Sequence, residues 1–145
     1  MIKKVDHVIM AVKNVDQAVA DYGKILGLTP EDGRIRELPK ARIGMLPVPK
    51  GARIELVERR PGGEENRHSK FLKEHGEGVV GLSIFIDDFD AEIARLKKKG
   101  VKVTVEEQKD LHPGYPFRMA WVPPEEAHGV WLEIVDDDAL PPHLQ

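Results

Sequence analysis

The sequence predicts an α+β protein made of two similar βαβββ modules. Two observations lead to this prediction. A strand followed by a capped helix occurs twice in the chain, and so does a strand that carries one glutamate between large aliphatic residues. Internal repetition on this scale determines the whole architecture, because each copy must adopt the same supersecondary structure.

The first copy begins with a strand at residues 5–12, where apolar and β-branched residues predominate. Apolar residues then recur at helical spacing. Asn14 or Asp16 is the candidate helix cap, and Gly27 lies where the helix would end. The pattern therefore predicts a strand, a polar turn and an amphipathic helix.

The second copy repeats this order from residues 79–86 onward. Placing His7 over Gly81 also places Asp16 over Asp90, so the strand, the cap and the helix repeat in register. A match that extends over three consecutive elements indicates an internal duplication.

Each copy also ends alike, with residues 52–58 corresponding to residues 130–136. Both segments read as strands, and Glu55 corresponds to Glu133. The space between helix and final strand fits two further strands in each module, at residues 33–37 and 42–48 in the first and at residues 101–106 and 117–122 in the second.

A chain of 145 residues is long enough for one domain with a substantial core, so we expect a single domain over residues 1–145. Its modules lie at about residues 3–58 and 78–136. Between them, residues 59–77 form a turn-rich linker with a short helix, ended by Gly76. The segment 136–145 is expected to be a loose tail.

Composition excludes several classes of protein and of site. The chain has no cysteine, which rules out disulfides, thiolate metal sites and cysteine nucleophiles. The net charge of −3 comes from interspersed charges, so no nucleic-acid surface is expected. No apolar run approaches the length that spans a membrane, and the N-terminus lacks the apolar segment of a signal peptide, so a cytoplasmic location is expected.

His7, Glu55 and Glu133 are the candidate site residues. Each glutamate interrupts an otherwise apolar strand, and two interpretations are open: an acid on the solvent side of its sheet, or an acid directed into a site. A pseudo-two-fold axis would bring equivalent residues of a duplicated chain together. One imidazole and two carboxylates suit a divalent cation such as Co²⁺, Mn²⁺, Ni²⁺, Fe²⁺ or Zn²⁺.

The segment D-H-V-I-M-A-V-K-N-V-D at residues 6–16 resembles the opening of vicinal-oxygen-chelate proteins, the glyoxalase/bleomycin-resistance/dioxygenase superfamily. Within it the chain is most similar to methylmalonyl-CoA epimerases, through R-I-E-L-V-E (53–58), F-L-K-E-H-G-E-G (71–78) and H-G-V-W-L-E-I-V (128–135). The resemblance implies a cupped, barrel-like mixed sheet and a metal held by His7, Glu55 and Glu133. Gly81 stands where the family has a further histidine ligand.

The resemblance also implies a chemistry. A metal-dependent isomerase of this type removes and returns a proton α to a thioester carbonyl through a metal-stabilised enolate. Glu133 is then a catalytic base as well as a metal ligand, and Glu37 is the candidate for the opposing base. The expected substrate is a small molecule, an acyl-CoA, and the expected assembly is a homodimer. The departure at Gly81 leaves two alternatives: a glyoxalase-like lyase, or a non-catalytic small-molecule binding protein.

Overall fold

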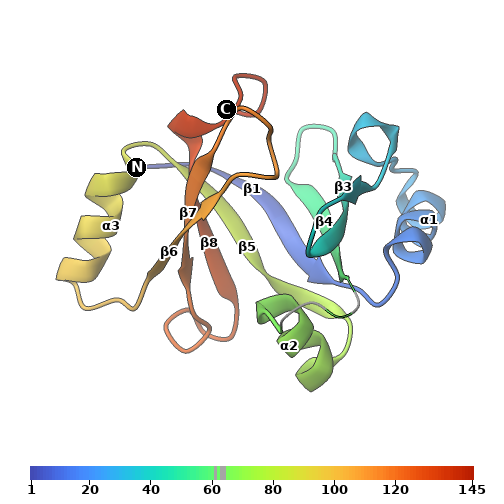
Figure 1. The fold of residues 1–145 in the computed structure, drawn as a ribbon, viewed down its shortest axis with the longest axis horizontal. Coiled ribbons are helices and arrows are strands. Elements are labelled where there is room, and N and C mark those ends of the chain that lie inside the picture. The colour runs from blue at the N-terminus through green and yellow to red at the C-terminus, as the bar shows by residue number, and fades with distance from the viewer. Residues whose placement is uncertain (61, 63–64) are drawn as a thin grey trace. The chain divides into compact units, whose positions relative to one another are not determined.

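The computed structural model describes residues 1–60, 62 and 65–145, which form two compact units. The N-terminal unit comprises residues 7–80, and the C-terminal unit comprises residues 1–6 and 81–145. Figure 1 shows the elements in chain order. They are β1 (Ile2–Ala11), α1 (Val15–Leu26), β2 (Arg36–Glu37), β3 (Ala41–Leu46), β4 (Arg53–Arg59), α2 (Arg67–His75), β5 (Gly78–Ile86), α3 (Phe89–Lys98), β6 (Thr104–Gln108), β7 (Phe117–Val122) and β8 (Trp131–Asp136), with 3₁₀ turns at Glu31–Gly33 and Asp137–Ala139.

The two units share one topology. In the N-terminal unit the strand order is β2-β3-β4-β1, with β1 and β4 parallel and the other pairs antiparallel. In the C-terminal unit the order is β5-β8-β7-β6, with β5 and β8 parallel and the other pairs antiparallel. Each is a βαβββ module with a mixed sheet, so the predicted fold class is confirmed. That the modules make up one domain remains a prediction.

Each module packs its helix on one face of its sheet (Figure 1). In the N-terminal unit α1 covers β3 and β4, and the core here includes Val15, Leu46 and Leu56. In the C-terminal unit Phe89 and Ile93 of α3 pack on the corresponding face of β5, β7 and β8. Because strand side chains alternate between faces, the residues between these core positions lie on the opposite face of each sheet.

The helix ends follow the capping signals of the sequence. The Asn14 side chain accepts a hydrogen bond from the Gln17 N–H, so Asn14 rather than Asp16 caps α1. Gly27 ends the helix with φ 70°, a left-handed conformation that favours glycine. The predicted linker helix, α2, begins at Arg67, because Asn66 and Ser69 form a reciprocal capping box. Linker residues 61, 63 and 64 lie outside the described residues.

Two predicted strands are shorter than expected at their start. Residues 33–37 were predicted as a strand, but Asp32 and Gly33 both have positive φ, so a turn precedes β2. Residues 101–106 were predicted as a strand, but β6 begins at Thr104. The Val101 N–H instead bonds to the Leu96 carbonyl, which holds residue 101 against the end of α3.

The prediction of a loose C-terminal tail is wrong. Leu140 is buried in the C-terminal unit, and the Asp137 carboxylate is fully buried and paired with Lys3 at 2.5 Å. Lys4 donates a hydrogen bond to the Leu144 carbonyl at 2.7 Å. The segment has neither helical nor strand periodicity, so sequence patterning misses contacts that single side chains make. No helix in the described part of the chain is long and apolar enough to cross a membrane.

Candidate active site

His7 and Glu55 lie together on the face of the N-terminal sheet that points away from α1. In the parallel β1–β4 pair, Ile9 is opposite Glu55 and His7 is opposite Arg53, so these side chains share one face. The His7 Nε2 lies 3.6 Å from the Glu55 Oε2. Only 7% of the imidazole and 11% of the carboxylate side chain are exposed. A nitrogen atom and an oxygen atom that could both coordinate a metal ion therefore lie close together, almost without exposure to solvent.

Glu133 occupies the equivalent place in the C-terminal unit. It lies on β8, in register with Ser83 of β5 and Trp121 of β7. The residue is buried, on the face of the sheet away from α3. Trp121 and Trp131 share this face and meet edge to face, with ring centroids 6.1 Å apart.

The interpretation of Glu55 and Glu133 as solvent-facing acids is wrong, because both are buried. Burial of a carboxylate is costly unless charged or hydrogen-bonding groups compensate it. Keeping two buried acids at equivalent positions of duplicated strands therefore costs the protein stability, which neighbouring groups must offset. Buried ionisable groups of this kind are typical of functional sites.

Gly81 is closed to any side chain by the neighbouring strand. It lies opposite Trp131 in the β5–β8 pair. A Cβ atom built on Gly81 would lie 2.0 Å from the Trp131 carbonyl oxygen and 2.8 Å from its carbonyl carbon. The obstacle is backbone, so the glycine permits a close approach of the two strands. Sequence spacing could not reveal this contact, because the two residues are far apart in the chain.

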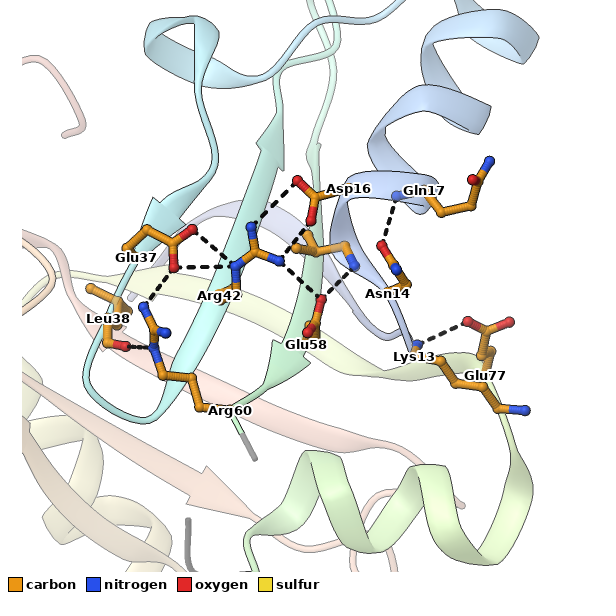
Figure 2. Close-up of polar contacts among 11 residues, drawn as sticks. Lys13, Asn14, Asp16, Gln17, Glu37, Leu38, Arg42, Glu58, Arg60 and Glu77 are labelled. Atoms are coloured by element: carbon orange, nitrogen blue, oxygen red, sulfur yellow. Dashed lines mark hydrogen bonds and ion pairs between the residues drawn. The ribbon is translucent and has the colours of Figure 1, made fainter. Parts of the chain in front are cut away.

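Glu37, the candidate for the opposing base, lies on the short strand β2 with half of its side chain exposed. Its carboxylate accepts hydrogen bonds from Arg42 Nε at 2.9 Å and from Arg60 Nη2 at 2.5 Å (Figure 2). Arg60 also donates to the Leu38 carbonyl. These contacts join β2, β3 and Arg60, the residue that follows β4, so Glu37 has a structural role.

Arg42 is the centre of this ion-pair cluster, in which it contacts Asp16, Glu37 and Glu58 (Figure 2). Glu58 also accepts a hydrogen bond from the Val15 N–H at the start of α1. The guanidinium of Arg42, on β3, thus links the start of α1 to β2 and β4. Arg42 is therefore committed to internal contacts.

The same arrangement recurs in the C-terminal unit around Arg118. This guanidinium contacts Asp90 at the start of α3 at 2.6 Å and Asp136 at the end of β8 at 2.9 Å. Asp90 is the residue that the repeat places over Asp16, and Arg118 lies on β7 as Arg42 lies on β3. The repeat predicted the equivalence of the aspartates. It did not predict the arginine that pairs with each aspartate, because the number of residues between the aspartate and its arginine differs between the two copies.

The Asp16–Arg42 pair gives a pH-dependent prediction. The hydrogen bond from Arg42 lowers the pKa of the Asp16 carboxyl below its ordinary value. A lowered folded-state pKa adds stability above the unfolded-state pKa, and this stability is lost as the pH falls through the folded-state value. Asp16→Asn should therefore lower the free energy of unfolding at neutral pH, and the difference from wild type should vanish in acid.

Urea denaturation over a pH series measures this difference. Asp21→Asn is the matched control, because Asp21 lies on the same helix and its side chain contacts Gln17 rather than an arginine. A wild-type-to-Asp16→Asn difference that stays constant from neutral to strongly acidic pH would contradict the prediction.

Arg53 is a residue of the candidate site that sequence analysis missed. It lies opposite His7, on the same face as His7 and Glu55, with 15% of its side chain exposed. Glu31 holds it at 3.2 Å and also holds Arg36 at 3.1 Å, so two guanidinium groups share one carboxylate. The sequence predicts which residues of β4 share a face, but it does not predict the turn that brings Glu31 to Arg53.

The His7–Glu55 pair fits a divalent cation of mixed nitrogen and oxygen preference as two of its ligands. A group of three or more His, Asp or Glu side chains suited to a metal ion is not found among residues 1–60, 62 and 65–145. The predicted three-ligand metal site of His7, Glu55 and Glu133 therefore stays a proposal.

The family of the chain follows from its sequence together with this fold. The family model described as Glyoxalase/Bleomycin resistance protein/Dioxygenase superfamily matches residues 6–118. The chain belongs to this superfamily, as its resemblance to vicinal-oxygen-chelate proteins predicted.

Several proteins similar to this chain are methylmalonyl-CoA epimerases. The human mitochondrial enzyme is 29% identical over 133 residues, which cover 90% of this chain and 72% of the human one. The crystal structure of the Mycobacterium tuberculosis enzyme is 29% identical, with a TM-score of 0.76, over 93% of this chain and 88% of that chain. A Streptomyces coelicolor epimerase variant in complex with 2-nitronate-propionyl-CoA is 26% identical, with a TM-score of 0.72, over 94% and 98% of the two chains. These relatives support the expectation that the chain is an enzyme.

Proposed function

We propose that this protein is a metal-dependent epimerase that acts on a 2-carboxyacyl-CoA of the methylmalonyl-CoA type. Support comes from relatives of this activity that match nearly the whole chain at 26–29% identity. The observation that carries the proposal is the burial of Glu55 and Glu133 at equivalent positions of the two modules. Neither acid lies on the solvent-exposed surface of its unit.

The proposed metal ligands are His7, Glu55 and Glu133. A divalent cation, when bound, supplies positive charge that stabilises negative charge developing at the thioester carbonyl oxygen. The protein supplies the donors, holds the His7 imidazole beside Glu55 and excludes bulk water from both acids. Exclusion of water strengthens each electrostatic interaction in such a site.

Glu133 is the proposed base that takes the α-proton of the substrate, since it is a buried carboxylate of the candidate site and a carboxylate can act as a general base. Glu37 is the proposed opposing base. It would have to give up a contact with Arg42 or Arg60 to reach a substrate, so its contribution has to be separated from its structural role. Arg53 is proposed to attract the substrate carboxylate, because it places a positive charge on the face that carries His7.

Exchange of the substrate α-proton with solvent tests the proposal most directly. Purified protein supplied with Co²⁺ or Mn²⁺ and methylmalonyl-CoA in D₂O should replace the α-proton by deuterium, which proton NMR detects as loss of the α-proton signal. Absence of exchange with either metal would refute the proposed activity.

Metal binding gives a second prediction, which does not depend on activity. Co²⁺ or Mn²⁺ at 100 times its dissociation constant should stabilise the wild type by about 2.7 kcal/mol, seen as a rise in Tm. His7→Gln should lose most of this rise, because it removes one of the two converging donors. His75→Gln is the control, since His75 is 62% exposed on α2. An equal metal-dependent rise in wild type and His7→Gln would exclude His7 as a ligand.

A non-catalytic binding protein is the alternative that a structural observation favours. The Trp131 backbone closes position 81 to any side chain, so β5 supplies no ligand at the position where the family has a histidine. Tight binding of methylmalonyl-CoA without proton exchange would identify this function. A glyoxalase-like lyase would instead bind metal and leave methylmalonyl-CoA unchanged. The homodimer remains a prediction that the oligomeric state in solution tests.

A further inference from the structure

The hydroxyl of Ser83 is a buried polar group that the internal contacts of the C-terminal unit do not use. Ser83 lies in the middle of β5 with no part of the residue exposed to solvent. Within the described residues its Oγ has no hydrogen-bond partner. Nearly all buried hydroxyls in folded proteins are hydrogen-bonded, and one that is not requires an explanation, such as a bound water or ligand.

Ser83 is directed to the same face as Glu133. The two residues are in register in the parallel β5–β8 pair, so their side chains leave the sheet on the same side, away from α3. The next inward position on β5 toward the N-terminus is Gly81, which the Trp131 backbone fills. Ser83 is therefore the first residue of β5 on this face that can offer a polar side-chain atom beside Glu133.

A hydroxyl next to a carboxylate has a defined use in binding. The hydroxyl donates a hydrogen bond, which an anionic or carbonyl oxygen accepts, and the carboxylate lies ready to accept a proton from the same ligand. A donor in a buried place also binds more strongly than one in water, since no solvent competes for it. The Ser83–Glu133 pair thus combines an oxygen-binding donor with a proton acceptor.

We propose that Ser83 Oγ donates a hydrogen bond to an oxygen of the bound acyl thioester, beside the carbon whose proton Glu133 takes. This inference rests on the proposed function and names the residue that recognises the reacting end of the substrate. Ser83 acts as a binding residue. It moves no proton of the substrate.

Ser83→Ala tests the inference through two measurements with different expected signs. Without ligand, the variant should have a Tm equal to or above that of the wild type, because it removes an unsatisfied buried hydroxyl. With 2-nitronate-propionyl-CoA as the probe, the metal-loaded variant should show a dissociation constant about tenfold higher by calorimetry, the loss typical of one hydrogen bond to a charged group. Affinity for coenzyme A alone should not change.

Ser69→Ala is the matched control. The Ser69 hydroxyl has partners, Asn66 and Arg59, so its removal should lower the Tm and leave affinity for the nitronate unchanged. Equal nitronate affinity in wild type and Ser83→Ala would overturn the inference while the proposed function stands. A Tm drop in ligand-free Ser83→Ala would also overturn it, by showing that the hydroxyl acts within the fold. If the wild type itself fails to bind the nitronate, both the inference and the proposed function fall.

Discussion

Glu133→Gln is expected to slow exchange of the substrate α-proton by about 10²- to 10⁴-fold, the usual contribution of a positioned general base. Glutamine keeps the size and polarity of the side chain but cannot accept the proton. Glu133 is 7% exposed and faces the side of its sheet away from α3, so no bulk water is present to take over its role. Proton NMR in D₂O measures the rate, at a metal concentration that saturates each variant.

The control for this variant is Glu107→Gln, because Glu107 is an exposed acid of β6 paired with Lys109. Wild-type exchange in Glu133→Gln with an unchanged Tm would remove Glu133 from the chemistry. Glu37→Gln belongs in the same assay. If Glu37 is the opposing base, the exchange rate of the folded Glu37→Gln protein falls as well as the Tm. If Glu37 only joins Arg42 and Arg60, the Tm falls and the exchange rate of the folded protein does not.

Gly81→Ala is expected to destabilise the protein by about 1–3 kcal/mol, the usual cost of forcing extra atoms into a packed site. The added Cβ would meet the Trp131 carbonyl oxygen at 2.0 Å, so β5 and β8 would have to separate at this point. Urea denaturation measures the change in the free energy of unfolding. A histidine at this position meets the same obstacle and is not expected to act as an additional metal ligand.

Gly78→Ala is the control on the same strand. Its Cβ would lie 3.7 Å from the nearest atom of Phe71, an ordinary van der Waals contact, so the change should be neutral or slightly stabilising. Equal stability of Gly81→Ala and wild type would show that β5 moves away from β8 without cost. The explanation of Gly81 as a close-approach glycine would then be wrong.

The sequence predicted the elements of the fold well because the signals for them are local. Strand and helix periodicity, a cap at Asn14 or Asp16, and Gly27 need only neighbouring residues, and the second copy repeats the same order of strand and helix. The choice of Asn14 as the cap came from the structure. The burial of Glu55 and Glu133 could be predicted only as one of two interpretations. The face that a strand residue occupies depends on which side the helix packs, and the helix packing is a tertiary contact.

The parts that could not be predicted depend on long-range contacts. The approach of Trp131 to Gly81, the pairing of Arg53 with Glu31 and the packing of Leu140 each join residues whose spacing in the chain is not periodic. Glu37 was selected by resemblance, but its partner Arg60 lies beyond the next two strands. Spacing gives no information on such a pair.

The edge-to-face pair of Trp121 and Trp131 has a practical consequence. These are the two tryptophans of the chain, and both lie on the face of the C-terminal sheet that carries Glu133. The intrinsic fluorescence of the protein therefore originates next to this acid. A label-free titration that follows emission wavelength and quenching will report occupancy at this face, so ligands can be screened optically without an assay of turnover.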